Sequence, residues 1–72
     1  MRLSQLTRLM DKDEYICVDY DDVPIDQMYA YDGKVGGIKK DDAINKCHVT
    51  SVSAFEDMIL VLISSQKKGG AE

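Results

Sequence analysis

The chain has 72 residues, of which 44% are hydrophobic and 31% charged, and its formal net charge is −4. This composition is typical of one small folded domain and excludes a disordered chain. The surplus of acid also argues against direct binding of nucleic acid, which requires an excess of lysine and arginine to neutralise phosphates.

Targeting signals and disulfides are equally unsupported. Residues 1–8 contain no continuous apolar stretch, so we predict no signal peptide, and the longest apolar run is far too short to span a membrane. Cys17 and Cys47 are too few for a disulfide scaffold, and we expect both to be free thiols, with a single bridge as the less favoured alternative. We therefore expect a cytoplasmic protein without membrane association.

The N-terminal residues predict a short helix. Leu6, Leu9 and Met10 follow a helical spacing, and Ser4 is a good N-cap, so we place the helix from about Ser4 to Met10. Two helical turns are not stable alone in water. The edge formed by these three apolar side chains is therefore expected to dock on a sheet.

Two strands and a hairpin are predicted next. Apolar and polar side chains alternate over residues 15–20 as in a strand. Residues 21–24 are expected to form a turn, because Pro24 prevents the strand from continuing through them. A second strand is expected over residues 25–31. Asp32-Gly33 then predicts a two-residue hairpin turn. Residues 35–38 suggest a short returning strand that its two glycines weaken.

The next segment predicts a loop and a bulged strand. Residues 39–46 are expected to form a loop with one helical turn capped by Asp41. Residues 47–55 predict a strand in which Val49 and Val52 differ in parity. A β-bulge near Thr50-Ser51 would bring both valines to one face. Glu56-Asp57 would then turn the chain into the last strand.

The strongest structural signal is Met58–Ile63, six consecutive apolar residues that predict a strand buried on both faces. One short helix cannot cover both faces, so either the sheet curls onto itself or a second subunit covers it. We predict an α+β, mainly β fold in which a short N-terminal helix packs on a curled antiparallel sheet of four or five strands, in a homo-oligomer. Residues 1–64 form a single small domain, and residues 65–72 a flexible tail.

Charge is divided unevenly along the chain. Residues 11–26 hold seven acids and one base, a charge of −6 that leaves +2 for the remainder. Such a segment is usually a solvated face, but it also suits a basic partner surface, with tyrosines as apolar anchors. Tyr29 and Tyr31 are expected to share one strand face. The candidate partner-binding residues are Asp13, Glu14, Asp19, Tyr20, Asp21, Asp22, Asp26, Tyr29 and Tyr31.

A glycine–lysine segment gives a second candidate site. Glycines let backbone N–H groups approach an anion, and lysines add positive charge, although the spacing is not that of a Walker motif. The alternative is a bulged return strand with ordinary surface lysines. The candidate ligand-binding residues are Lys34, Gly36, Gly37, Lys39 and Lys40.

Catalytic, metal and cofactor sites find no support. Cys47 and His48 are adjacent on a predicted strand, so their side chains should diverge. Together with Cys17 they do not match a zinc-binding spacing. The acidic run at residues 19–22 lacks the glycine and the closing glutamate of an EF-hand. We expect a protein that is not an enzyme and needs no cofactor.

Several stretches resemble small uncharacterised proteins encoded by phages and prophages of gut bacteria. The resemblance rests on residues 3–6 leading to 10–13, then 15–19, 37–46 and 57–62. It implies a phage context, in which short, acidic, non-enzymatic proteins bind and block host machinery. No functional residue is carried over from it.

Three hypotheses follow. The first is a counter-defence inhibitor that occupies a basic surface of a host protein, such as a nucleic-acid-binding or defence protein, in the host cytoplasm. The second is a homo-oligomeric sponge that sequesters a phosphate-bearing nucleotide signal at residues 33–40. The third is a small structural subunit that assembles with a larger complex.

Overall fold

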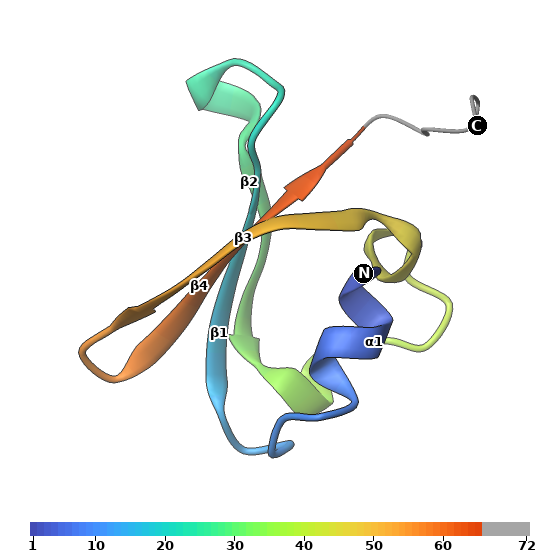
Figure 1. The fold of residues 1–72 in the computed structure, drawn as a ribbon, viewed down its shortest axis with the longest axis vertical. Helices are drawn as coiled ribbons and strands as arrows, with labels where there is room; N and C mark the ends of the chain where they lie inside the picture. Colours follow the sequence, from blue (N-terminus) through green and yellow to red (C-terminus); the bar gives the residue numbers. More distant parts are fainter. Residues whose placement is uncertain (66–72) are drawn as a thin grey trace.

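The computed structural model describes residues 1–65 and shows a mainly β fold with one short helix (Figure 1). The predicted tail therefore lies outside the described residues, apart from its first residue, Ser65. The regular elements are helix α1 (Leu3–Thr7) and strands β1 (Tyr15–Tyr20), β2 (Tyr29–Lys34), β3 (His48–Phe55) and β4 (Met58–Ser64). Three short 3-10 turns complete the fold: η1 (Ile25–Gln27), η2 (Val35–Gly37) and η3 (Ala43–Lys46).

The four strands form an open mixed sheet in the order β2-β1-β4-β3. β1 pairs antiparallel with β2, and β3 antiparallel with β4, but β1 and β4 run parallel. The prediction of a wholly antiparallel sheet is therefore wrong at its centre. Because β2 and β3 lie at opposite edges, the segment between them must cross the sheet, and this crossing with η2 and η3 lies on the same side as α1 (Figure 1).

The core lies between the sheet and this crossing layer. Leu3, Val35 and Ile44 come from α1, η2 and η3, and they close over the side chains that β1 and β4 direct to one face. Burial of these apolar side chains is the main stabilising contribution in so small a domain. The buried hydrophobic residues are Leu3, Ile16, Val18, Val35, Ile44, Val61 and Ile63.

The unbroken apolar sequence of β4 predicted a strand buried on both faces, but the structure, in which β4 lies inside the sheet, fully buries only one of them. Val61 and Ile63 are fully buried on the covered face, whereas Leu60 and Leu62 on the opposite face are only half-buried. The sheet does not close on itself, and no element of residues 1–65 forms a second layer over that opposite face. The predicted homo-oligomer stays a prediction.

The bulge in β3 is confirmed. Val49 pairs with Ile63 and Ser51 with Leu62, so Thr50 is the extra residue. The shift brings Val49 and Val52 to the same face of the sheet, because one added residue reverses the alternation.

The second strand, predicted over residues 25–31, is confirmed only for its last three residues, and the hairpin predicted after it is wrong. Residues 25–27 form a 3-10 turn, and the strand begins at Tyr29. Asp32 and Gly33 lie within β2, paired with Cys17 and Ile16. Gly33 has φ +153, and a Cβ there would lie 3.1 Å from the Tyr31 hydroxyl oxygen. Gly33 is therefore a strand residue, and its lack of a side chain lets the strand pass close to the ring of Tyr31.

The short elements also differ from expectation. Helix α1 starts earlier than predicted and has Arg2, not Ser4, as N-cap, and Leu9 is 79% exposed rather than docked. The short return strand predicted over residues 35–38 is absent, and residues 35–37 form the 3-10 turn η2. The predicted turn within residues 39–46 is η3, capped by Asp42 rather than Asp41, since the Ile44 N–H donates to Asp42 Oδ1 at 3.1 Å.

Helix α1 is held against the β3 edge by backbone hydrogen bonds. The Leu3 N–H donates to the Cys47 carbonyl at 2.9 Å, and the Val49 N–H to the Met1 carbonyl at 2.8 Å. A five-residue helix has little stability of its own, so these bonds and the burial of Leu3 fix its position. The position of α1 in turn determines where Arg2 and Arg8 lie.

Candidate functional site

Two surfaces on opposite sides of the sheet are candidates for function. The first is the sheet face that no element of the described residues covers, which we call the open face. Strand alternation and register assign it Tyr15, Cys17, Asp19, Tyr29, Asp32, Lys34, Ser51, Ser53, Phe55, Met58, Leu60 and Leu62. The second is a pocket between α1 and the crossing segment.

The open face has an apolar centre with aromatic side chains around it. Met58, Leu60 and Leu62 project from the central strand β4 and are half-buried by their neighbours. Tyr15, Tyr29 and Phe55 are 50%, 67% and 59% exposed. Contiguous apolar surface of this kind on a small protein marks an interaction site more often than scattered exposed side chains do.

Tyr29 and Tyr31 do not share a face, contrary to the prediction. Val18 pairs with Tyr31 while the next residue, Asp19, pairs with Tyr29, so Ala30 is a bulge. Tyr29 consequently lies on the open face, whereas Tyr31 packs against the core and donates its hydroxyl to the Lys34 carbonyl at 2.6 Å.

Negative charge lies beside the apolar centre. Burial, and then the carboxylates of Asp19 and Asp32, raise the pKa of the Cys17 thiol, which places these three groups near one another. Lys34, at the end of the edge strand β2, is the only lysine or arginine among the residues of the four strands. The middle of the open face therefore attracts a partner that carries basic groups.

The predicted acidic site is not one continuous face. Asp13 and Glu14 are exposed before β1, and Asp26 is exposed in η1 beyond its far end. At about 3.3 Å per strand residue, Glu14 and Asp21 lie roughly 20 Å apart. Tyr20 packs against the core, and of the predicted set only Asp19 and Tyr29 belong to the open face.

Asp21 and Asp22 bind the neighbouring strands. Thr50 donates its hydroxyl to Asp21. Asp22 accepts bonds from the Ser65 N–H at 3.0 Å, from the Ser65 hydroxyl at 2.8 Å and from the Ser64 hydroxyl at 3.0 Å. These donors, the Ser65 N–H foremost, lower the pKa of Asp22 to about 2. Both residues therefore join the end of β1 to the ends of β3 and β4.

Asp22 gives a prediction for acid stability. Its pKa is lower in the folded chain than its ordinary value of 3.8, so its contribution is fully present above about pH 4 and is lost as the pH falls toward about 2. We expect Asp22→Asn to flatten this part of the pH profile of urea unfolding, followed by circular dichroism. The control Asp26→Asn, at an exposed acid in η1, should keep the wild-type profile. Equal profiles for wild type and Asp22→Asn would contradict the role assigned to these bonds.

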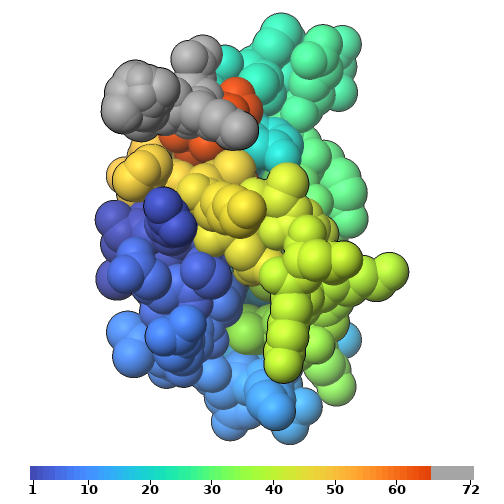
Figure 2. Space-filling model, turned by 90° about the vertical axis from the view of Figure 1, so that its right-hand side faces the viewer, coloured from blue at the N-terminus to red at the C-terminus, as the bar shows by residue number. Residues whose placement is uncertain are grey.

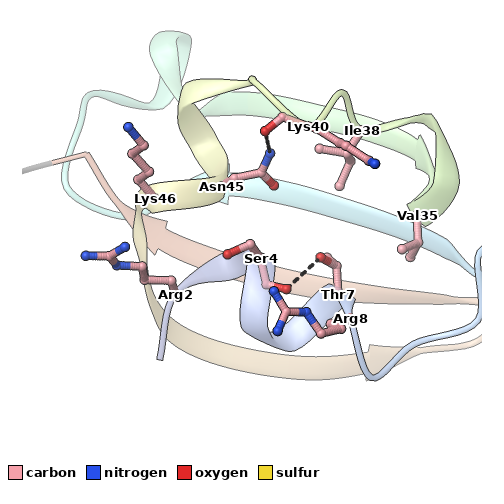
Figure 3. Close-up of a pocket in the computed structure, with 9 residues that line it drawn as sticks. All are labelled: Arg2, Ser4, Thr7, Arg8, Val35, Ile38, Lys40, Asn45 and Lys46. Atoms are coloured by element: carbon pink, nitrogen blue, oxygen red, sulfur yellow. Dashed lines mark hydrogen bonds between the residues drawn. The ribbon is translucent and has the colours of Figure 1, made fainter.

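The pocket on the other side of the molecule is basic. It has a volume of about 480 Å³ and lies between α1 and the segment that carries η2 and η3 (Figure 3). Figure 2 faces this side, with α1 in blue and the segment around Lys40 and Lys46 in yellow-green to yellow. The residues that line the pocket are Arg2, Ser4, Thr7, Arg8, Val35, Ile38, Lys40, Asn45 and Lys46.

The glycine–lysine segment contributes less to this pocket than its sequence suggested. Lys40 lines the pocket, but Lys34 and Lys39 do not. The Gly36 N–H donates to the Lys12 carbonyl at 2.9 Å, so it is already bound within the chain. Gly37 lies against the Tyr31 hydroxyl, where a Cβ would collide with it. The glycines therefore allow close packing rather than forming an anion cradle.

The sequence interpretation did not identify Arg2, Arg8 or Lys46. A signal was present, because residues 1–10 contain two arginines and no acid in a chain with an acidic net charge. That asymmetry became meaningful only once the fold placed these arginines opposite Lys40 and Lys46.

The cysteines and the histidine form no joint site. Cys17 lies on the open face, whereas Cys47 packs against the core, and both are free. Burial raises the pKa of the Cys47 thiol, and the carboxylates of Asp22 and Asp42 add to the effect. His48 is exposed. Raised thiol pKa values oppose formation of the reactive thiolate.

The described part of the chain contains neither a metal-binding cluster nor a membrane-spanning helix. Among the described residues, no three His, Cys, Asp or Glu side chains lie close enough to hold a metal ion. Within residues 1–65, no helix has the length and apolar character needed to cross a membrane. Comparison of the chain with protein-family models, with curated proteins and with solved structures found no match.

Proposed function

We propose that this chain is a small, non-enzymatic binding protein that docks its open face on a partner protein whose surface is apolar and basic. The observation that carries the proposal is the uncovered side of the central strand. Met58, Leu60 and Leu62 remain accessible there because the crossing segment and α1 cover only the other face. Covering such side chains removes apolar surface from water, which favours association.

The aromatic side chains supply the anchors. Tyr29 and Phe55 lie on opposite edge strands of the sheet, and each is more than half exposed. Aromatic residues dominate the binding energy of many interfaces because they bury large areas at low entropic cost. A partner that reaches both edges would cover the apolar centre between them.

The charges select a basic partner. Asp19 and Asp32 flank Cys17 on the open face. Complementary charge raises association rates and rejects acidic partners more than it raises affinity. The resemblance to phage-encoded proteins implies that the partner is a host protein, which this chain would inhibit by masking its basic surface.

The test compares two double charge reversals with the same net charge. In Asp19→Lys/Asp32→Lys both changes lie on the open face, and in Asp13→Lys/Asp26→Lys both lie at exposed acids outside it. A photo-crosslinking residue in place of Tyr29 identifies the partner in host cells, and surface plasmon resonance measures its affinity. We expect the first variant to bind at least about tenfold more weakly, and the second to bind within about threefold of wild type.

A second pair of variants tests the apolar contribution. Tyr29→Ala should weaken binding at least about tenfold, as truncation of an aromatic anchor does. Leu9→Ala removes an exposed apolar side chain next to α1 and should have no effect. Equal losses in both charge-reversal variants would point to diffuse electrostatics and contradict the proposal. A stable dimer, seen by analytical ultracentrifugation and broken by Tyr29→Ala, would replace the host partner with a second copy of the chain.

A further inference from the structure

We infer that the basic pocket between α1 and the crossing segment binds a small phosphate-bearing organic anion. This inference goes beyond the proposed function, because the pocket lies on the side of the sheet opposite the open face. It involves none of the residues of the open face.

Charge segregation is the first argument. Residues 1–65 contain seven lysines and arginines, and four of them, Arg2, Arg8, Lys40 and Lys46, line this pocket. None of the acids within residues 1–65 lines it. Four like charges around one hollow repel one another and reduce the stability of the folded chain. An anion bound there would remove that repulsion.

The placement of the charges is the second argument. Figure 3 shows Arg2 and Lys46 at one end of the pocket, the charged end of Arg8 beside Ser4 near its middle, and the charged end of Lys40 toward the other end. Each end therefore has at least one cation, and the two sides come from segments far apart in the sequence. Arginine can bind phosphate oxygens in a bidentate manner, and lysine adds a compact charge. This arrangement fits a ligand with more than one anionic oxygen group.

The pocket's interior is the third argument. The four basic side chains are exposed at its rim, whereas Ser4, Thr7, Ile38 and Asn45 are half-buried and Val35 is buried. A volume of about 480 Å³ lies within the usual range for small-molecule sites, about 300–1,000 Å³. Apolar Val35 and Ile38 beside polar groups offer contacts to the organic part of a ligand as well as to its phosphates.

Asn45 holds one wall of the pocket in place. Its side-chain N–H groups donate to the carbonyls of Lys39 and Lys40 at 2.8 and 3.1 Å. These bonds fix the backbone from which Lys40 projects. Because both bonds engage the amide nitrogen of Asn45, its side-chain oxygen points the other way, into the pocket. Figure 3 shows this oxygen directed toward α1. A fixed wall lowers the entropic cost of binding.

The test uses two probes, inorganic pyrophosphate and ADP, titrated into the full-length chain and followed by amide chemical shifts in NMR spectra. We expect shifts concentrated at residues that line the pocket. Tighter binding of ADP than of pyrophosphate would assign contacts to the nucleoside. Equal affinity would define a site for the phosphate groups alone, and either result supports the inference.

Two matched double variants distinguish binding in the pocket from non-specific electrostatic attraction between the ligand and the protein surface. Arg8→Glu/Lys40→Glu changes two lining residues, and Lys12→Glu/Lys39→Glu changes two lysines outside the lining by the same net charge. We expect the first variant to weaken binding at least about tenfold and the second to weaken it by less than about threefold. Lys39 and Lys40 are neighbours, so this pair is a stringent control. Circular dichroism and unshifted amides of β4 show that each variant is folded.

Three outcomes would overturn the inference. The first is equal weakening in both double variants, which would indicate diffuse attraction. The second is the absence of pocket shifts with either probe at millimolar concentration. The third is tighter binding of a short single-stranded RNA than of ADP, lost in Arg8→Glu/Lys40→Glu, which would identify a nucleic-acid contact instead. The open-face variant Tyr29→Ala should leave ADP binding unchanged, so this inference and the proposed function can fail separately.

Discussion

Replacing Ile63 with alanine is expected to lower the free energy of unfolding by about 2–5 kcal/mol. Ile63 is fully buried in the central strand, where it pairs with Val49 of β3 and lies beside Tyr20 of β1. The alanine would leave a cavity beneath the crossing segment that the rigid sheet cannot collapse to fill. A chain of this length has a total stability of about 4–11 kcal/mol, so the variant would lose a large part of it.

Val52→Ala is the matched control for this change. Val52 lies on the same side of the sheet but on the edge strand β3, and it is 51% exposed. Its truncation should cost less than about 1 kcal/mol. Urea unfolding followed by circular dichroism measures both variants. A loss for Ile63→Ala no larger than that for Val52→Ala would show that the core does not lie where the structure places it.

Leu3→Ala is expected to have the second large effect, again about 2–5 kcal/mol. Leu3 is the only fully buried residue of α1, and a helix of five residues depends on that contact to stay docked. Because α1 positions Arg2 and Arg8, the variant should also weaken binding of ADP to the basic pocket.

Leu9→Ala provides the comparison for Leu3. Leu9 is 79% exposed, and its loss should change the free energy of unfolding by no more than about 0.5 kcal/mol. The helical spacing of the sequence assigned the docking role to Leu6, Leu9 and Met10, of which Leu6 and Met10 do pack against the core and Leu9 does not. Equal destabilisation by Leu3→Ala and Leu9→Ala would support that earlier assignment against the structure.

Features that depend on neighbouring residues could be predicted from the sequence. The strand at residues 15–20 and the bulge in β3 follow from alternation and from the parity of nearby valines, and the apolar run at residues 58–63 predicted the strand β4. The hairpin at Asp32-Gly33 was predicted by the same local reasoning and was wrong. Its turn preference is outweighed by pairing with β1 and by the ring of Tyr31.

The candidate surfaces depend on distant contacts, which local patterns do not contain. The sequence showed an excess of acid and suggested that the acidic segment itself was the binding surface. In the fold, Asp21 and Asp22 serve as structural acceptors, and the open face obtains its charge from Asp19 and Asp32 on adjacent strands. Arg2 and Lys46 line one pocket although 44 positions separate them in the chain.

The sequence by itself determined that this protein is mainly β, with a short N-terminal helix and an apolar strand at residues 58–63, because hydrophobic periodicity is a local property. Only the tertiary structure decided that β1 and β4 are parallel neighbours and that the chain crosses the sheet on one side. Strand pairing and crossover depend on the burial of residues some 40 positions apart. That single crossing leaves one face open and gathers the basic side chains on the other.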